Sequence, residues 1–408
     1  MIDINLVRTN PDVVRQACRA KGSDVDVERL IEVDAELRRT QLHMEELRHQ
    51  QKDVGRDTPI ETARKLKEEL RDATEQVRLL QEERDALWVW VPNLVAEDTP
   101  VGDDDEGNVE LRREGETVPA DEARAHDKIG DRLGIFDMAR GAEVAGSGFY
   151  YWKGDGARLA WAIFSYAQNL LHGRGFEPML TPLVARERTF FGTGYLPFFE
   201  DQLYRVQDTE LSLIGTSEQT LIGYYGDTIV DLDELPIQLC AFSPCFRTEA
   251  GSAGRSNRGG YRVHQFHKVE QIIICAPEDS EHWLNECQRN AEDILRGLEL
   301  PYRVVRVCLG DLGAPAYKKY DTETWFPSFG AYRETHSNSN LIDYQARRFK
   351  IRFKRDGKTI HPHTISSTGI TDRAALAVLE NHVQPDGSIY VPEALRPYLG
   401  GQERLGSR

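Results

Sequence analysis

Two series of apolar residues in the first hundred positions follow the spacing of paired helices. The first begins at Leu30 and advances by three and four, although Thr40 and Gln51 occupy the same stripe. The second runs from Ala63 to Leu87 and is interrupted by Arg84. Apolar residues at this spacing, with charged residues between them, are typical of helices that pack side by side. The two series consist of Leu30, Val33, Leu37, Met44, Leu47 and Val54, and of Ala63, Leu66, Leu70, Ala73, Val77, Leu80 and Leu87.

A cluster of helix-breaking residues at 55–59 separates the two series. The pattern therefore predicts an antiparallel helical hairpin at about 28–90, with arms on the order of 40 Å long at 1.5 Å rise per residue. Its basic residues alternate with about as many acids, so charge alone favours a solvated face. By itself the hairpin fits a dimerisation coiled coil or a spacer as well as an arm that binds phosphates. The basic residues are Arg38, Arg39, Arg48, Lys52, Arg56, Arg64, Lys65 and Lys67.

An acidic, turn-rich stretch at 97–107 (EDTPVGDDDEG) predicts an interdomain linker. We expect an N-terminal domain at 1–105 and a second domain at 106–408, since 408 residues suggest two or three domains at roughly 150 residues each. In the second domain, helical patterns at 157–171 and 279–298 mix with strand-like runs at 238–241, 269–276, 302–308 and 349–353. Several strands follow one another without a helix between them. This order favours an α+β fold with a mostly antiparallel sheet over a doubly wound one.

The overall charge argues against a surface with general affinity for nucleic acid, although it leaves room for a local basic groove. There are 51 Lys and Arg against 67 Asp and Glu, for a net charge of −16. No apolar run reaches the roughly 18 residues of a membrane-spanning helix, and the N-terminus lacks the pattern of a secretory signal. The six cysteines contain no CxxC pair and no zinc-binding spacing. We therefore expect a cytoplasmic protein with small, buried, reduced cysteines and no membrane partner.

The most unusual segment lies at 244–270, where an extended run enters a loop rich in Gly, Ser and Arg and returns into an apolar strand. It predicts a β-hairpin with a basic loop that has few acids near it. In so acidic a chain, a local excess of arginine indicates an anionic ligand such as phosphate, and a solvated hairpin tip is the alternative. Neither a P-loop nor a Rossmann fingerprint is present, so a nucleotide would be held in another way. The arginines of the loop are Arg247, Arg255, Arg258 and Arg262.

Residues 246–270 read FRTEAGSAGRSNRGGYRVHQFHKVE, which resembles motif 2 of class II aminoacyl-tRNA synthetases in the form found in seryl-tRNA synthetases. Further segments resemble that family in order and spacing, namely 192–197 (GTGYLP), 216–218 (TSE), 332–340 (YRETHSNSN), 343–348 (DYQARR) and 379–398. The resemblance covers nearly the whole chain. It implies that the hairpin is a tRNA-binding arm and that the second domain is a class II catalytic domain. It also implies activation of L-serine with ATP and Mg²⁺ to seryl-adenylate and transfer of serine to the 3′ end of tRNA-Ser, with tRNA-Sec as a further candidate substrate.

The same resemblance implies a set of ATP-binding residues. Arg247 would bridge the α-phosphate and the serine carboxylate, and Arg262 and Arg333 would hold the γ-phosphate; these three are the implied catalytic residues. Adenine would lie between Phe266 and Arg373, stacked on a ring and under a cation. Glu249 would lie beside the adenine amino group. Oxygen ligands for Mg²⁺ would come from Glu334 and Ser337.

Serine binding is implied for a second group of residues. Thr216 and Glu218 would contact the ammonium group, and Arg247 the carboxylate. Glu270 would accept the serine hydroxyl, with Thr368 as a second partner. A buried carboxylate that expects a hydroxyl rejects alanine, because alanine leaves it unpaired.

Some positions depart from the family pattern next to these pockets. Ser366 stands where Asn is usual, and one residue is missing before Arg373. Asp372 precedes that arginine, and we expect it to pair with Arg373 and weaken its stacking on adenine. Two alternative functions follow: an adenylating paralogue with an acceptor other than tRNA, or an inactive tRNA-binding homologue. The helix at 158–171 and a strand around Pro182 match motif 1, which implies a homodimer.

Overall fold

The computed structural model describes residues 1–55, 58–250 and 259–406. The chain forms two compact units, Met1–Leu94 and Val95–Arg408. The boundary expected at 105/106 and the functions expected of the two domains stay predictions. No helix in the described part of the chain is long and apolar enough to cross a membrane.

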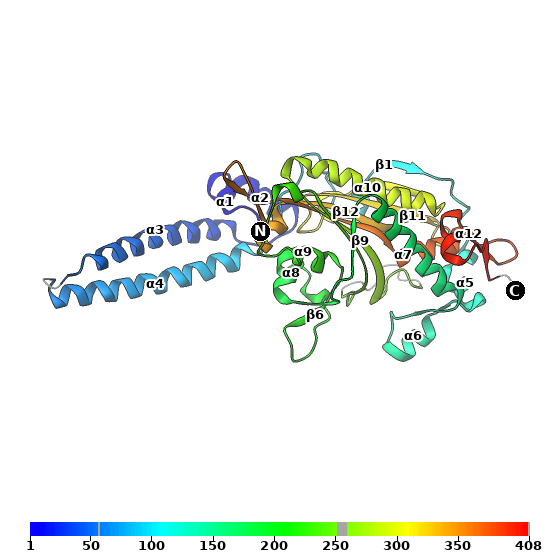
Figure 1. The fold of residues 1–408 in the computed structure, drawn as a ribbon, viewed down its shortest axis with the longest axis horizontal. Helices are drawn as coiled ribbons and strands as arrows, with labels where there is room; N and C mark the ends of the chain where they lie inside the picture. The colour runs from blue at the N-terminus through cyan, green and yellow to red at the C-terminus, as the bar shows by residue number, and fades with distance from the viewer. Residues whose placement is uncertain (56–57, 251–258, 407–408) are drawn as a thin grey trace. The chain divides into compact units, whose positions relative to one another are not determined.

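The first unit is helical and contains a hairpin of two long helices (Figure 1). Helix α3 begins after Asp26, whose side chain accepts a hydrogen bond from the backbone of Arg29 and caps the helix. Helix α4 begins after Pro59. The turn residues Arg56 and Asp57, one of them a basic residue noted above, lie outside the described residues. The helices of this unit are α1 (Ile4–Thr9), α2 (Pro11–Ala20), α3 (Val27–Lys52) and α4 (Ile60–Trp88).

The two apolar stripes meet along the hairpin, as their spacing predicts. Buried members of both helices form one cluster, which contains Val33, Leu37, Met44, Leu47, Ala73, Val77 and Leu80. The stripe ends earlier than expected, because Val54 lies beyond the end of α3 and is exposed. Arg84 is accommodated by lying over the Trp88 ring at 5.4 Å. Pairing of the two stripes therefore holds the hairpin together.

The second unit is built on a large mixed sheet that is antiparallel except at one edge. Within the described residues this sheet has eight strands in the order β1-β10-β11-β12-β15-β9-β8-β4, and the β4–β8 pair is parallel. The expected α+β fold with a mostly antiparallel sheet is confirmed. Its strands are β1 (Val109–Glu114), β4 (Glu177–Met179), β8 (Ile237–Phe246), β9 (Gln265–Cys275), β10 (Tyr302–Arg306), β11 (Lys318–Phe326), β12 (Ala331–Ile342) and β15 (His363–Thr371).

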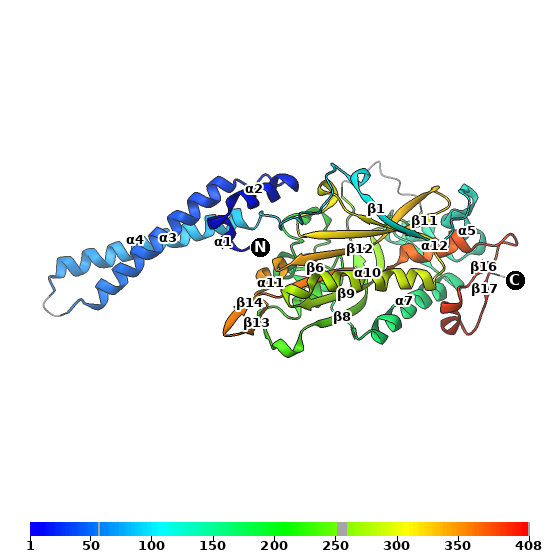
Figure 2. The ribbon, with the colours of Figure 1, turned by 90° about the horizontal axis from the view of Figure 1, so that it is seen from above.

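Helices cover both faces of this sheet (Figures 1 and 2). Helices α7 (Asp155–Gly173), α10 (Ser280–Gly297) and α12 (Asp372–His382) share the main hydrophobic core with Val269, Ile273 and Cys275 of β9. Helices α9 (Glu218–Gly223) and α11 (Tyr344–Phe349) pack against Ile272 and Ile274 of the same strand. Successive residues of β9 thus face opposite layers, as side chains of a strand do.

Shorter elements complete the unit. Its other helices are α5 (His126–Leu133), α6 (Met138–Ala145) and α8 (Glu187–Thr193). Its other strands are β2 (Phe136–Asp137), β3 (Tyr151–Trp152), β5 (Val184–Arg186), β6 (Leu211–Leu213), β7 (Ile229–Val230), β13 (Arg352–Arg355), β14 (Lys358–Ile360), β16 (Ile389–Tyr390) and β17 (Arg404–Leu405).

The structure corrects two local expectations. The strand expected at 349–353 begins only at Arg352, because residues 344–349 form helix α11 and Lys350 adopts a left-handed conformation that ends it. The strand expected around Pro182 is absent at that described residue, which lies between the short strands β4 and β5. Short apolar runs fit a strand and a buried helix equally well, which explains the first error.

The acidic stretch at 97–107 is tied to the second unit. The backbone N–H groups of Leu309 and Gly310 donate to the carbonyls of Pro100 and Gly102. Asp98 forms ion pairs with Arg306 and Lys318. The turn-forming residues that suggested a linker therefore shape an ordered segment.

Removing a core side chain of the hairpin should destabilise it. Leu37 is 1% exposed, and we expect Leu37→Ala to lower the free energy of unfolding by about 3 kcal/mol, because the buried methyl groups leave a cavity. Leu42 of the same helix is 62% exposed, so Leu42→Ala is the matched control. Urea unfolding followed by circular dichroism measures both, and equal effects of the two substitutions would contradict the pairing.

Candidate active site

A cavity of about 550 Å³ opens over the centre of the large sheet. Charged, aromatic and hydroxyl side chains line it from β9, β12, β15, the start of α12 and the hairpin between β8 and β9. Most of the residues expected to bind ATP and serine are brought together here. Those that line the cavity are Thr216, Glu218, Arg247, Glu249, Arg262, Phe266, Glu334, Ser337, Thr368 and Arg373.

The remaining two predicted residues lie beside the cavity. Glu270 is 2% exposed and lies beneath the lining residues Thr216 and Lys268, with which it interacts. Among the described residues that line the cavity, Arg333 is absent. Its guanidinium lies over the rings of Tyr261 and Phe329 at 4.9 and 5.0 Å. The loop arginines Arg255 and Arg258 lie outside the described residues.

The pleat of β9 selects which of its residues belong to the cavity. Phe266, Lys268 and Glu270 alternate along the strand and share the face that Ile272 and Ile274 use to contact α9 and α11. Their neighbours Gln265 and His267 line a different cavity, beside α7. A period of two therefore places an aromatic ring, a cation and a carboxylate in one row.

A β-bulge places the carboxylate of Glu334 and the hydroxyl of Ser337 in the same cavity. Residues three apart on a regular strand point to opposite faces. In β12, however, Glu334 pairs with Glu323 and His336 pairs with Thr322, so Thr335 is an extra residue. Both side chains consequently line the cavity and bring a carboxylate and a hydroxyl oxygen to it. No cluster of three or more metal-binding His, Cys, Asp or Glu residues occurs in the described ranges.

Arg247 and the pair formed by Glu249 and Arg262 follow the end of β8. The Nε of Arg247 donates to the carbonyl of Gly215 at 3.3 Å, and its guanidinium lies 5.2 Å from the centre of the Phe266 ring. The Nη1 of Arg262 donates to the carboxylate of Glu249 at 2.6 Å. Glu249 has a φ of +52°, a conformation that turns the chain sharply after the strand. The hairpin thus points two guanidinium groups at the same cavity.

Tyr261 links the hairpin to β12 and to the start of α12. Its hydroxyl donates to the backbone carbonyl of Glu334 at 2.8 Å, and Arg373 lies over its ring at 4.4 Å. The Nη1 of Arg373 also donates to the Glu334 carboxylate at 3.2 Å. Burial raises the pKa of Glu334, but the charges of Arg373 and Lys319 more than offset this and lower it below its usual value. Glu334 is therefore ionised at neutral pH.

The buried end of the cavity has two carboxylates and one cation. Glu270 accepts hydrogen bonds from the hydroxyls of Thr216 at 3.0 Å and Ser366 at 3.2 Å, and it forms an ion pair with the nearly buried Lys268. Thr368 is the residue opposite Glu270 in the β15–β9 register. A carboxylate surrounded by hydroxyl donors recognises small polar ligands.

Glu218 is the second carboxylate. Gln345 donates to it at 2.7 Å, and Gln345 is held in turn by the Thr364 hydroxyl. Burial, and then the negative charge of Glu270, raise the pKa of Glu218. A cationic ligand at this position would relieve both effects, because an opposite charge favours the ionised form.

The expected pairing of Asp372 with Arg373 is wrong. The Asp372 carboxylate accepts hydrogen bonds from Tyr150, Trp152 and His267. Arg373 points away from it, toward Tyr261 and Glu334. Adjacent residues in the first turn of a helix project in different directions, so neighbours in sequence do not pair here.

The sequence analysis missed three residues of this site. Tyr261 lies within the arginine-rich segment, Lys268 lies one pleat before Glu270, and Gln345 lies within the 343–348 segment. Period-two spacing from Glu270 identifies Lys268. Tyr261 and Gln345 act through side chains and backbone groups that are distant in sequence, so their own positions contain no comparable signal.

The fold and cavity together define the class of the protein. An antiparallel sheet supports the arginines of one hairpin and the arginine at the start of α12, and residues 202–382 match the family described as tRNA synthetase class II core domain (G, H, P, S and T). The catalytic unit is that of a class II aminoacyl-tRNA synthetase. Residues 1–95 match the seryl-tRNA synthetase N-terminal domain.

Relatives and solved structures narrow this class. The chain is 42% identical to a serine–tRNA ligase of Caldanaerobacter subterraneus subsp. tengcongensis, over 98% of each chain. It is 41% identical to that of Deinococcus radiodurans, over 100% of this chain and 99% of the relative. The seryl-tRNA synthetase of Pyrococcus horikoshii, solved with ATP, superposes with a TM-score of 0.93 at 35% identity over 99% of each chain. The chain belongs to the seryl-tRNA synthetase family and is an ATP-dependent ligase.

The free energy of unfolding should decrease as the pH is lowered, because of one buried histidine in β12. Burial lowers the pKa of His336 to about 4, against an ordinary value near 6.5. The unfolded chain therefore binds the proton first as pH falls below about 6.5, and the loss of stability is complete near pH 4. Between pH 7 and 5 the contribution is about 2 kcal/mol. We expect His336→Asn to reduce the pH dependence of the free energy of unfolding by that amount.

The matched control is His282→Asn, since the His282 side chain is 61% exposed. Urea unfolding at pH 7 and pH 5 compares both variants with the parent chain. If the free energy of unfolding changed equally between pH 7 and pH 5 in all three proteins, the prediction would be wrong, because His336 would then take up its proton as readily in the folded state as in the unfolded chain.

Proposed function

We propose that this cavity forms seryl-adenylate from L-serine and ATP, and that serine is then transferred to the 3′ end of tRNA-Ser. One observation carries the assignment: the arginines of the β8–β9 hairpin and a buried pair of carboxylates that accept hydrogen bonds from hydroxyl and amide groups meet at the same cavity. The matches to serine–tRNA ligases support the same activity. They give no support to the paralogue with another acceptor or to the inactive homologue.

The resemblance to the family implies the roles of the ATP-binding residues, and the contacts in the cavity support these roles. Arg247 would join the α-phosphate to the serine carboxylate, because its side chain contacts Gly215, the neighbour of Thr216. Arg262 and Arg333 would hold the γ-phosphate, and Glu249 would release Arg262 from their ion pair to meet the adenine amino group. Phe266 and Arg373 would enclose adenine. These groups act by position and charge, as is usual for reactions at phosphorus.

Magnesium fits this donor set as an ion that arrives with the nucleotide. Glu334 and Ser337 present two oxygens on one side of the cavity, and Mg²⁺ is typically held by one or two protein oxygens together with phosphates. A bound Mg²⁺ ion would neutralise part of the negative charge of the phosphates. Glu334 would then exchange its contact with Arg373 for the metal.

The serine pocket would discriminate by hydroxyl pairing. Thr216 and Glu218 would take the ammonium group, and Glu270 would accept the substrate hydroxyl with help from Thr368. The excess negative charge of Glu218 and Glu270 over Lys268 favours any amino acid with a free ammonium group. Selection of serine over alanine would therefore depend on Glu270, which alanine leaves unpaired.

Serine-dependent exchange of pyrophosphate into ATP tests the proposal. We expect exchange with serine and far less with threonine, alanine, cysteine or glycine. Arg247→Ala should lower the rate by about 100-fold or more, because it removes a charge that faces the reacting phosphate. Arg188→Ala is the control, since Arg188 is an exposed surface residue of α8. No exchange with any amino acid would contradict the assignment, and charging of tRNA-Ser and tRNA-Sec transcripts then tests the transfer step.

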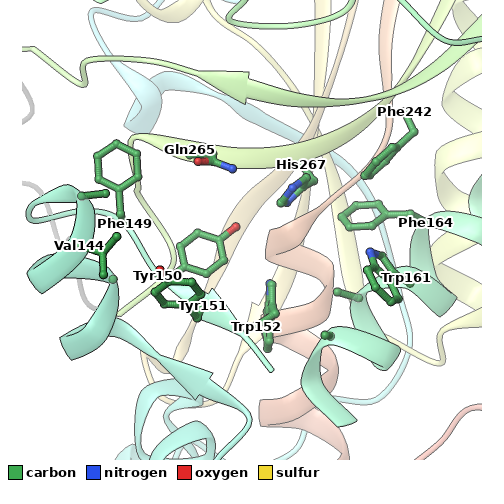
Figure 3. Close-up of a pocket in the computed structure, with 14 residues that line it drawn as sticks. Val144, Phe149, Tyr150, Tyr151, Trp152, Trp161, Phe164, Phe242, Gln265 and His267 are labelled. Atoms are coloured by element: carbon green, nitrogen blue, oxygen red, sulfur yellow. The ribbon is translucent and has the colours of Figure 1, made fainter. Parts of the chain in front are cut away.

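We also propose a homodimer formed through the face around α7. Trp161 of α7 is 68% exposed, and Val144 and Tyr151 are 70% and 44% exposed. All three line one aromatic cavity (Figure 3). An exposed apolar patch of this kind supports an interface. The six cysteines are free and buried, which supports a reducing compartment, and we place the enzyme in the cytoplasm.

Trp161→Asp should weaken the dimer by about thirtyfold in Kd, because a buried tryptophan at an interface is worth about 2 kcal/mol or more. Sedimentation velocity across a dilution series measures the change. Val101→Asp is the control, since Val101 is 87% exposed and does not line this cavity. A dimer unchanged by Trp161→Asp would place the interface elsewhere.

A further inference from the structure

Asp372 is a carboxylate with 3% exposure that separates two cavities. On one side it lines the active-site cavity together with Arg373. On the other side lies the aromatic cavity of about 370 Å³ beside α7, and the partners of Asp372, namely Tyr150, Trp152 and His267, line that cavity (Figure 3). The proposed roles of ATP-binding residues do not use Asp372.

The Asp372 carboxylate accepts hydrogen bonds from three residues. The Tyr150 hydroxyl donates to Oδ2 at 2.9 Å, and the Trp152 indole N–H donates to Oδ1 at 3.1 Å. His267 contributes its backbone N–H and lies with Nδ1 3.1 Å from Oδ2. Burial lowers the pKa of His267, but the hydrogen bond and the negative charge of Asp372 more than offset this and raise it above its usual value, which favours a donating, protonated ring. Asp372 thus joins strand β3 and the residue before it, strand β9 and helix α12.

The hydrogen bond from the backbone N–H of His267 to Asp372 lies at the end of a strand ladder. The β9–β15 ladder ends with the pair Lys268 and Thr371. The next residues in each direction are His267 and Asp372, and here the Asp372 side chain accepts the N–H that a further strand residue would have accepted. One step beyond lie Phe266 and Arg373. The peptide group between Phe266 and His267 is therefore fixed to the residue that precedes Arg373.

We propose that Asp372 is a positioning residue for adenine, which sets the separation between Phe266 and Arg373 by extending the β9–β15 ladder with its side chain. The inference rests on the proposed roles of Phe266 and Arg373 in holding adenine. Asp372 touches neither substrate in this scheme, and it acts through the two residues that do. A longer or looser connection would widen the adenine site while leaving the serine pocket around Glu270 intact.

Asparagine is a sharp probe of this role. It keeps the shape of the side chain, but its amide nitrogen would face N–H and O–H donors in place of an acceptor oxygen. We expect Asp372→Asn to raise KM for ATP about tenfold in pyrophosphate exchange, the effect of losing one charge-assisted hydrogen bond. KM for serine should stay within about twofold, because the Glu270 cluster shares no bond with Asp372. A purely structural role would change kcat, or both KM values, together.

Two further sets of variants keep the test decisive. Tyr150→Phe and Trp152→Phe each remove one donor and serve if Asp372→Asn does not fold; each should raise KM for ATP about threefold. Glu292→Gln is the matched control, because Glu292 is equally buried and accepts from Arg112 and Tyr302 on another part of the unit. It should change the melting temperature without changing the ratio of the two KM values.

The outcomes separate this inference from the proposed function. If Arg373→Ala raises KM for ATP but Asp372→Asn, Tyr150→Phe and Trp152→Phe change both KM values equally, the positioning role is overturned and the adenine site stands. If Arg373→Ala leaves KM for ATP unchanged, or if the parent enzyme shows no serine-dependent exchange, both the adenine roles and the positioning role are overturned. A selective rise in KM for ATP in the Asp372 and donor variants supports the inference.

Discussion

The active site depends on the alternation of side chains along β9. Consecutive residues of the strand face opposite layers. Phe266, Lys268 and Glu270 therefore lie on the side of the active-site cavity, while His267 lines the aromatic cavity beside α7. Antiparallel pairing with β8 and β15 fixes this row relative to Arg247 and Thr368. A shift of one residue would exchange the two faces. The chemistry at both ends of the cavity is therefore set by a single strand register.

Local periodicity accounts for what the sequence predicted well. The helical hairpin follows from its heptad spacing, and its buried stripe from Leu30 to Leu80 matches the structure. The β8–β9 hairpin follows from a turn-rich loop between two apolar runs. Most of the candidate site was also identified, but through resemblance to a family, because neither burial nor pairing of Glu270 can be read from an isolated apolar run.

Contacts between distant segments account for what the sequence could not predict. Strands β11, β12 and β15 have polar residues at buried positions, such as Thr324 and Asn338, so their hydrophobic pattern is weak. Asp372 pairs with Tyr150 and Trp152, more than two hundred positions earlier, and its neighbour Arg373 is a poor guide to its partner. The prediction that the hairpin stripe extends to Val54 was wrong for a related reason, since a hydrophobic pattern does not show where a helix ends.

The extra residue at Thr335 has a consequence for how this enzyme tolerates change. Glu334 and Ser337 share a face only because β12 is one residue longer than its partner β11 at that point. Exchanging one side chain for another there alters a single group of the cavity. Deleting one residue would instead restore a regular strand and turn either Glu334 or Ser337 out of the cavity. In this part of the chain, its length is thus a stricter determinant of the catalytic centre than the identity of most side chains.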